Sequence, residues 1–369
     1  MVFMCLICLR GSVRADSQAV SWEDMVPVSS MELSYASQFS VDYYEGGCKL
    51  ISIFNGQNIL VIPEGAPYVE GLPQDMVVLH LPLDHIYLAA TSAMDHFNRL
   101  DGLDNIAFSS QKADGWYIEE ARSAMENGDI VYAGKYSAPD YELLLSAGCD
   151  LAVENTMIYH TPEVMEQLIR LGIPVIVERS SYEEHPLGRM EWIRLYAALI
   201  DREDTAQQYY DDLRYKVEEI MDQENTGKTV AFFSVNSVGA VNVRKSGDYV
   251  AKSINLAGGQ YISYDESEEE NSLSTMNIQM ESFYSAARDA DVIIYNSTIE
   301  GEIESIDELL RKSPLLADFK AVQEGNAWCI EKNFYQESLE LGELILDVHK
   351  ILTEDDPDEE QLYFLHRLK

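Results

Sequence analysis

The feature that most constrains the fold is a long stretch, residues 188–223, that carries no strand pattern. Apolar residues recur through it at helical spacing, from Met190 to Ile220. A helix of this length extends ~50 Å at 1.5 Å per residue, enough to run along a whole lobe. Glu203 and Asp204 suit a helix N-terminus, so we expect a kink near Asp201. The pattern predicts one long helix that divides the chain.

Short apolar runs alternate with helical patterns on both sides of this helix, which is typical of parallel sheets covered by helices on both faces. Before it, strands are predicted at 39–54 (a hairpin around Glu45-Gly46-Gly47), 59–62, 77–81, 106–108, 151–153 and 174–177, with helices at 86–100, 116–127, 139–147 and 162–171. After it, strands are predicted at 229–235, 240–243, 291–295 and 327–330, with helices at 246–257, 278–287, 303–310 and 339–352.

The fold class is therefore α/β: two doubly wound lobes with central, mostly parallel sheets joined by one long bridging helix. A chain of 369 residues also exceeds the usual size of one hydrophobic core. We expect an N-terminal extension or signal remnant at 1–34, an N-terminal lobe at 35–185, the bridging helix at 186–224 and a C-terminal lobe at 225–369.

The formal net charge of −38 restricts the partners. A surface this acidic repels phosphate backbones and anionic lipid headgroups. Nucleic-acid binding is therefore not expected. The charge favours solubility first and attraction of cations second. The acidic loop at 266–270 is expected to be a solvated surface.

The N-terminal segment MVFMCLICLRG is apolar but too short to span a bilayer, which takes ~20 residues. It is similar to the end of a secretory h-region, with Val13-Arg14-Ala15 as a poor cleavage site. A basic start is absent, and neither Cys5 nor Cys8 follows the small residues of a lipoprotein signal. Cys5 and Cys8 have a CxxC spacing within this apolar segment, but no second Cys or His pair accompanies them and the other three cysteines stand singly, so the spacing predicts neither a zinc site nor a disulfide framework.

No catalytic motif stands out. The sequence lacks GxSxG, HExxH and a Walker A loop, and Gly258-Gly259 ends a predicted helix instead of opening one. Binding is therefore favoured over catalysis, and neither a resident cofactor nor a metal site is assigned. Four histidines fall near predicted strand ends, where imidazoles could ligate a metal, but their spacing gives no three-ligand pattern: they are His80, His85, His160 and His185.

Five stretches, in this order, resemble the class III solute-binding proteins, which are the siderophore, haem and cobalamin receptors of ABC importers. The similarity extends from about Tyr35 to Leu352. The stretches are 130–136 with Pro139 and Glu142; Cys149-Asp-Leu-Ala-Val153, where Cys replaces the family's Pro; Leu171-Gly-Ile-Pro-Val-Ile-Val177; His185-Pro-Leu-Gly-Arg-Met-Glu-Trp-Ile193; and 313–322 with Gly325-Asn-Ala-Trp328.

The resemblance implies an extracytoplasmic binding protein, periplasmic or a cell-surface lipoprotein, that captures an iron complex or corrinoid between its lobes. We expect a monomer that delivers the ligand to an ABC permease dimer and catalyses no reaction. A siderophore, haem and a corrinoid stay open as ligands. The alternatives are direct binding of zinc or manganese and, in another class, a nitrogenase-like two-lobed enzyme or assembly factor with cysteine cluster ligands.

Aromatic and cationic residues near the predicted cleft loops are the candidate ligand contacts. Rings with polar tips suit a flat macrocycle or a catecholate complex, and arginines can bind an anionic complex with two hydrogen bonds. Trp116 and Trp192 are candidate fluorescence reporters. The ligand-binding candidates are Trp116, Tyr136, Tyr159, His160, Arg179, Tyr182, Arg244, Tyr295, Phe334 and Tyr335.

Two glutamates carry a further expectation from the resemblance. In the family, one glutamate on the outer surface of each lobe docks against arginines of the permease. The matching phrases place Glu142 and Glu281 in those positions. An ordinary solvated Glu at a helix start, favoured by the helix dipole, is the alternative.

Overall fold

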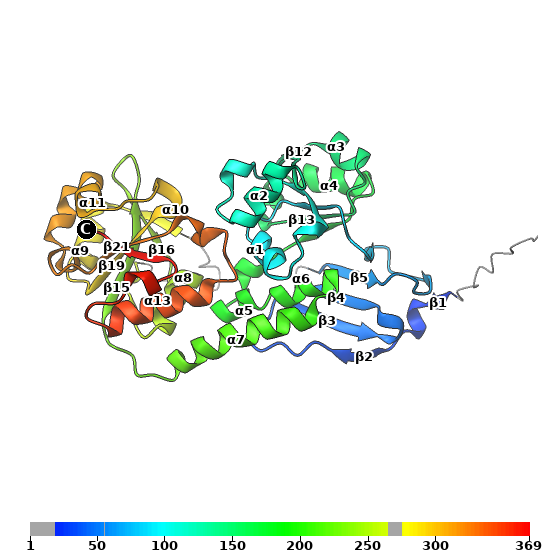
Figure 1. The fold of residues 1–369 in the computed structure, drawn as a ribbon, viewed down its shortest axis with the longest axis horizontal. Helices are drawn as coiled ribbons and strands as arrows, with labels where there is room; N and C mark the ends of the chain where they lie inside the picture. The colour runs from blue at the N-terminus through cyan, green and yellow to red at the C-terminus, as the bar shows by residue number, and fades with distance from the viewer. Residues whose placement is uncertain (1–18, 55, 265–274) are drawn as a thin grey trace, which may run out of the picture.

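The computed structural model describes residues 19–54, 56–264 and 275–369 as two α/β lobes (Figure 1). The N-terminal segment with Cys5 and Cys8 and the acidic loop at 266–270 lie outside the described residues. The two-lobed α/β class predicted from the alternation of strands and helices is confirmed.

The N-terminal lobe contains a five-stranded, fully parallel sheet. Alternate residues of its central strands face opposite layers: Ile86 and Leu88 pack toward the first two helices, and Tyr87 toward the next two. This two-sided burial explains the continuous apolar runs. In spatial order the strands are β10 (Val131–Tyr132), β9 (Ile106–Ser109), β8 (Ile86–Leu88), β13 (Leu151–Glu154) and β14 (Val175–Val177); the helices are α1 (Ala93–Arg99), α2 (Glu119–Asn127), α3 (Tyr141–Ser146) and α4 (Pro162–Arg170).

One helix prediction in this lobe is wrong at its start. Residues 86–88 form the central strand β8 and the helix begins only at Ala93. The run from Ile86 to Ala90 is fully buried between two neighbouring strands, and this pairing overrides a helical pattern that periodicity alone cannot distinguish over so few residues.

A second five-stranded sheet precedes it, and the predicted hairpin is confirmed there. Its first two long strands pair antiparallel, and Gly46 and Gly47 adopt φ of 81° and 83° in the turn. The order is β2 (Pro27–Ser30), β3 (Phe39–Tyr44), β4 (Lys49–Ile53), β5 (Asn58–Ile62) and β7 (Val77–His80); short pairs are β1 (Val20–Ser21) with β6 (Val69–Glu70) and β11 (Gly134–Lys135) with β12 (Ala138–Pro139).

The C-terminal lobe has one mixed sheet of seven strands with helices on both faces. Its central strands are parallel and its outer strands antiparallel. The order is β18 (Thr275–Ile278), β16 (Val241–Arg244), β15 (Thr229–Val235), β19 (Val292–Asn296), β20 (Ala327–Ile330) and β21 (Leu365–Arg367), with β17 (Gln260–Tyr261) beside β15; the helices are α8 (Tyr249–Leu256), α9 (Met280–Ala287), α10 (Ser297–Glu300), α11 (Ile306–Lys312), α12 (Lys320–Gln323) and α13 (Leu341–Thr353).

The segment between the lobes contains no strand, and each sheet draws its strands from one side of it only. It is not one continuous helix: α5 (Pro186–Met190), α6 (Ile193–Ile200) and α7 (Glu203–Met221) follow one another, and α7 runs along both lobes (Figure 1). The break falls at Asp201, which adopts a left-handed conformation (φ 55°). Lys49 of β4 stabilises the break, because its Nζ lies 3.0 Å from the Ala198 carbonyl oxygen and 2.6 Å from the Asp201 carboxylate.

One hydrophobic core extends through this segment. It joins α1, α6, α7, α8 and α13 with residues of both lobes, such as Phe97, Tyr196, Leu213 and Ile345. Such apolar packing across the junction favours modest movements of the lobes over wide opening. No helix in the described part of the chain is long and apolar enough to cross a membrane.

Candidate ligand-binding site

The lobes meet where α1 and α5 approach α8, α13 and the short helix η8 (Lys332–Tyr335). Gln336, which is fully buried, follows η8 and reaches into the N-terminal lobe. Its Oε1 accepts a hydrogen bond from the Tyr117 backbone N–H at 2.7 Å, and its Nε2 donates to the Gly115 carbonyl oxygen at 2.7 Å. One side chain thus fixes the backbone of the opposite lobe at two points.

A second group of contacts crosses between α1 and the start of α13. The Leu339 N–H donates to Asp95 at 3.0 Å, and Arg99 pairs with Glu340 at 2.8 Å. Ser338 Oγ donates to the Ser92 carbonyl oxygen at 2.8 Å. Burial raises the pKa of Asp95 well above its usual value, although Arg99 opposes this shift. These bonds hold α1 of the N-terminal lobe against the start of α13 in the C-terminal lobe.

Two arginines lie on the same tyrosine ring at this junction. The Cζ atom of Arg189 (α5) is 4.2 Å from the centre of the Tyr249 ring, and Cζ of Arg244 (β16) is 5.8 Å from it. Both guanidinium groups have a buried Nε–H without an acceptor among the described residues. Asp248 lies 3.5 Å from Arg244 and partly balances its charge. The arrangement concentrates positive charge and unused donors in a strongly acidic protein.

A neutral histidine borders this cluster from the N-terminal lobe. Burial lowers the pKa of His96 to about 3, and the positive charge of Arg189 lowers it further. Its Nε2 lies 3.2 Å from Ser338 Oγ. His96 therefore adds no charge, and the arginines remain the cationic groups of the cluster.

An exposed aromatic pair lies beside the cluster. Tyr117 of the N-terminal lobe and Tyr335 of η8 meet edge to face with ring centres 6.1 Å apart, and they are 44% and 37% exposed. Phe334, which precedes Tyr335 in the chain, is buried, and its ring centre lies 6.2 Å from that of Tyr249. Solvent-facing rings contributed by both lobes can stack on a flat ligand, while the arginines bind its anionic groups.

The structure brings three predicted ligand residues to this junction: Arg244, Phe334 and Tyr335. Arg179 and Tyr182 stack on each other at 4.1 Å, and Arg179 Nε donates to Gln38 Oε1 at 3.3 Å. The other polar candidates lie elsewhere in the N-terminal lobe: Tyr136 is half-buried against the α3–α4 layer, and Tyr159 and His160 are exposed on η5 (Thr156–His160).

Two predicted contacts are core residues in this conformation. Trp116 is 1% exposed, and its Nε1 donates to Ser109 Oγ at 3.2 Å within the N-terminal lobe. Tyr295 is 1% exposed in the α9–α11 layer of the C-terminal lobe. Both are strand-end or loop positions that look accessible in the sequence, but packing turns their rings inward.

The sequence reasoning missed four residues of the junction: Tyr117, Arg189, Tyr249 and Gln336. Arg189 does lie within the family phrase that begins at His185, and Tyr117 is next to the predicted Trp116. Tyr249 and Gln336 carry no signal of their own, because their importance depends on the approach of the other lobe.

The two candidate docking glutamates are both exposed, and each lies in the first turn of a helix, Glu142 in α3 and Glu281 in α9. The helix positions agree with the phrases that predicted them. The two helices belong to different lobes (Figure 1).

In the described part of the chain, the residues predicted for the rival sites do not come together. Cys48, Cys149 and Cys329 are free and buried in three separate hydrophobic clusters, so the described residues form no cysteine-ligated cluster site. His80, His85, His160 and His185 likewise belong to no group of three metal-ligating side chains in the described chain. His185 instead caps α5, since its Nδ1 accepts from the Leu187 N–H at 3.1 Å.

Two α/β lobes, a strandless connection and a charged, aromatic junction define the class: a solute-binding protein. The family model "Periplasmic binding protein" matches residues 91–332, and the chain belongs to this family. Its members bind small molecules and work with ABC permeases, and the resemblance to the class III type is confirmed. The chain is extracytoplasmic, as the resemblance implied.

The three similar proteins described next are distant in sequence. An uncharacterized lipoprotein of Methanocaldococcus jannaschii is 22% identical, with 87% of this chain and 81% of the relative covered. Among solved structures, a periplasmic haem-binding protein of Pseudomonas aeruginosa has a TM-score of 0.59 at 15% identity, covering 78% of this chain and 98% of its own. A catecholate-siderophore-binding protein of Vibrio cholerae has a TM-score of 0.56 at 12% identity, covering 73% and 94%. At these identities the likeness shows the fold alone.

Proposed function

We propose that this protein is the substrate-binding subunit of an ABC importer, that it captures an anionic iron chelate, haem or a corrinoid between its lobes, and that it catalyses no reaction. The observation that carries the proposal is the pair of arginines on Tyr249, each with a buried Nε–H that finds no acceptor among the residues the structure describes. In a chain of net charge −38, such a cluster offers a carboxylate or catecholate oxygen the strongest charge-assisted hydrogen bonds.

The exposed rings of Tyr117 and Tyr335 support a large, flat ligand over a small ion. A metal complex of this kind offers both an apolar face for stacking and anionic oxygens for the guanidinium groups. The structurally similar haem-binding and catecholate-siderophore-binding proteins agree with this choice.

Delivery to a permease dimer by a monomeric, membrane-anchored protein completes the proposal. The relative from Methanocaldococcus is a lipoprotein, and a lipid anchor would hold this acidic protein near the membrane surface that it otherwise avoids. Glu142 and Glu281 are the proposed docking residues.

The test is a titration of the purified protein with a ferric catecholate, haemin and cobalamin, followed by tryptophan fluorescence and by the visible spectrum of the chelate. We expect one of the three to bind with micromolar or tighter affinity and to quench the emission of Trp116 and Trp192, because coloured chelates accept excitation energy from nearby indoles. ZnCl2 and MnCl2 are titrated in parallel. No response to any of the three chelates would disprove this function, and zinc or manganese binding at residues of the junction would then favour the metal-ion alternative.

A further inference from the structure

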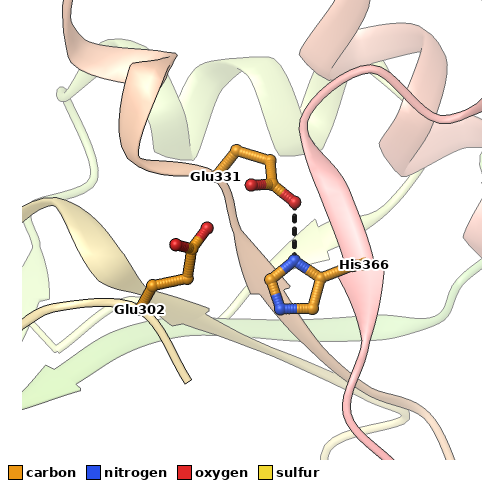
Figure 2. A group of neighbouring side chains, drawn as sticks. All are labelled: Glu302, Glu331 and His366. Carbon is orange, nitrogen blue, oxygen red and sulfur yellow. Dashed lines mark hydrogen bonds and ion pairs between the residues drawn. The ribbon is translucent and has the colours of Figure 1, made fainter. Parts of the chain in front are cut away.

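A second group of polar side chains lies apart from the lobe junction cluster and belongs entirely to the C-terminal lobe. Glu331 follows β20, His366 lies on β21, and Glu302 comes from the loop after α10 (Figure 2). One ligand atom from each of the three lies within 4.8 Å of the other two. Figure 2 shows the Glu302 carboxylate directed toward the space beside the other two groups.

The pairing of β20 with β21 creates this arrangement. Cys329 pairs with His366 in the antiparallel ladder, and Glu331 lies just beyond the end of β20. His366 Nδ1 is 2.7 Å from Glu331 Oε1. Strand geometry thus fixes the imidazole and one carboxylate close together, although thirty-five residues separate them along the chain.

The other ring nitrogen determines what Nδ1 can do. His366 Nε2 lies 2.9 Å from the Ile303 carbonyl oxygen, which can only accept, so Nε2 carries a hydrogen. Metal-binding histidines commonly donate their second N–H to a backbone carbonyl in this way, which fixes the ring with its other nitrogen toward the ion. Nδ1 faces the carboxylates in that orientation.

The carboxylates around the cluster are only partly balanced by nearby cations. Lys332 Nζ lies 2.9 Å from Glu302 Oε2 and occupies one oxygen of that carboxylate. Burial and the approach of Glu331 raise the pKa of Glu302, since two carboxylates crowd one place. Glu304 adds a third carboxylate 3.8 Å from His366 Nε2. In the free cluster, the ammonium group of Lys332 and the proton of the imidazole offset part of the negative charge of the carboxylates.

The cluster is open to solvent on one side. His366 also borders a wide, shallow hollow of about 720 Å³ lined mostly by acidic residues. Such an acidic hollow raises the local concentration of cations beside His366. Its remaining lining residues are Asp356, Pro357, Asp358, Glu359, Glu360 and Lys369.

We propose that Glu302, Glu331 and His366 form a binding site for a divalent transition-metal ion of the zinc class, separate from the ligand site between the lobes. Two carboxylate oxygens and one imidazole nitrogen give three protein ligands and leave a fourth position for water or for a donor of a bound molecule. On binding, the Nδ1–H bond breaks, an Nδ1–metal bond forms, and the proton passes to the solvent.

Proton release provides a direct readout. Because His366 Nδ1 lies 2.7 Å from a carboxylate oxygen of Glu331, the hydrogen between these two atoms must leave before the ion can bind Nδ1. Titration calorimetry with ZnCl2 in two buffers of different ionisation enthalpy should show one site and the release of about one proton per ion. Affinity should rise with pH. Cobalt should give the visible spectrum of a four-coordinate site without a sulfur charge-transfer band.

Three variants identify the ligands. His366→Gln and Glu331→Gln should each weaken zinc binding at least ~10-fold, and Glu302→Gln, at a half-buried position, serves if the first two do not fold. Glu304→Gln is the matched control, because this carboxylate is 77% exposed and outside the three ligands; its affinity should change less than threefold, by roughly the effect of one surface charge.

Zinc binding that is absent, or that survives all three substitutions, would show that the cluster is only an ion pair holding β21 to β20. Chelate binding between the lobes should be the same in His366→Gln and in the wild type. The outcome for this site is therefore independent of the proposed function.

Discussion

Arg189 and Tyr249 meet across the lobe junction, with the guanidinium carbon 4.2 Å from the centre of the ring. One residue comes from the first helix of the connection and the other from the first turn of α8. Stacking holds the guanidinium plane in place while leaving its N–H groups free to bind. The pair is thus a prepared anion-binding surface between two halves of the protein.

Replacing Arg189 with Met should weaken binding of an anionic chelate by ~10- to 100-fold, since a charge-assisted hydrogen bond contributes roughly 1.5–3 kcal/mol. The change keeps an unbranched apolar side chain and removes the guanidinium group with its charge. Arg311→Met is the control, because Arg311 is 69% exposed on α11 and should not affect binding. Fluorescence titration measures both, and equal affinities in the two variants would contradict this role of Arg189.

Gln336→Ala should loosen the lobe junction. The substitution removes the hydrogen bonds to the Tyr117 N–H and the Gly115 carbonyl, worth roughly 2 kcal/mol together. Hydrogen exchange at the Tyr117 amide should accelerate at least tenfold. Gln323→Ala, an exposed glutamine bonded within its own lobe, should leave that exchange unchanged. Unaltered protection of Tyr117 in Gln336→Ala would mean that other contacts hold the junction.

Glu154 should make stability depend on pH. Both of its carboxylate oxygens are buried without a hydrogen-bond partner among the described residues, and burial raises its pKa to about 8. The folded protein then retains a proton that the unfolded chain releases above its ordinary pKa of 4.5. The stabilising difference is therefore fully present below that value and is lost as the pH rises toward 8.

Glu154→Gln removes this dependence. The free energy of unfolding of Glu154→Gln, relative to that of the wild type, should rise by up to about 4 kcal/mol between pH 5 and pH 8. The reason is that, at the higher pH, the folded wild type must either hold a proton that the unfolded chain releases or bury a charged carboxylate. Urea unfolding at both pH values measures the difference, and Glu126→Gln, exposed on α2, is the control. A wild-type-minus-variant difference that is constant with pH would refute the assignment.

Changing both Glu142 and Glu281 to Ala should weaken association with the permease and transport while leaving chelate affinity intact. Each rim contact should contribute ~1–3 kcal/mol when it is partly desolvated. Glu126→Ala, at another exposed helix position, should have no effect. Full ligand uptake by a double Glu→Lys variant would exclude docking through these residues.

The layered α/β architecture and the strandless connection could be predicted from the amino-acid sequence alone. Buried strands such as β13 and β19 are short, continuous apolar runs, and the helices between them repeat apolar residues at helical spacing. These signals are local, so one sequence is enough to find them. The left-handed turn at Asp201 also appeared where acidic residues interrupt the helical pattern.

Which side chains meet in a site depends instead on long-range packing. Arg189 and Tyr249, or Glu302 and His366, are far apart in the chain and come together because lobes pack and strands pair. The same packing turned Trp116 inward and made residues 86–88 a strand. Local patterns specify which elements form, whereas the contacts of a site depend on the long-range burial that places those elements against each other.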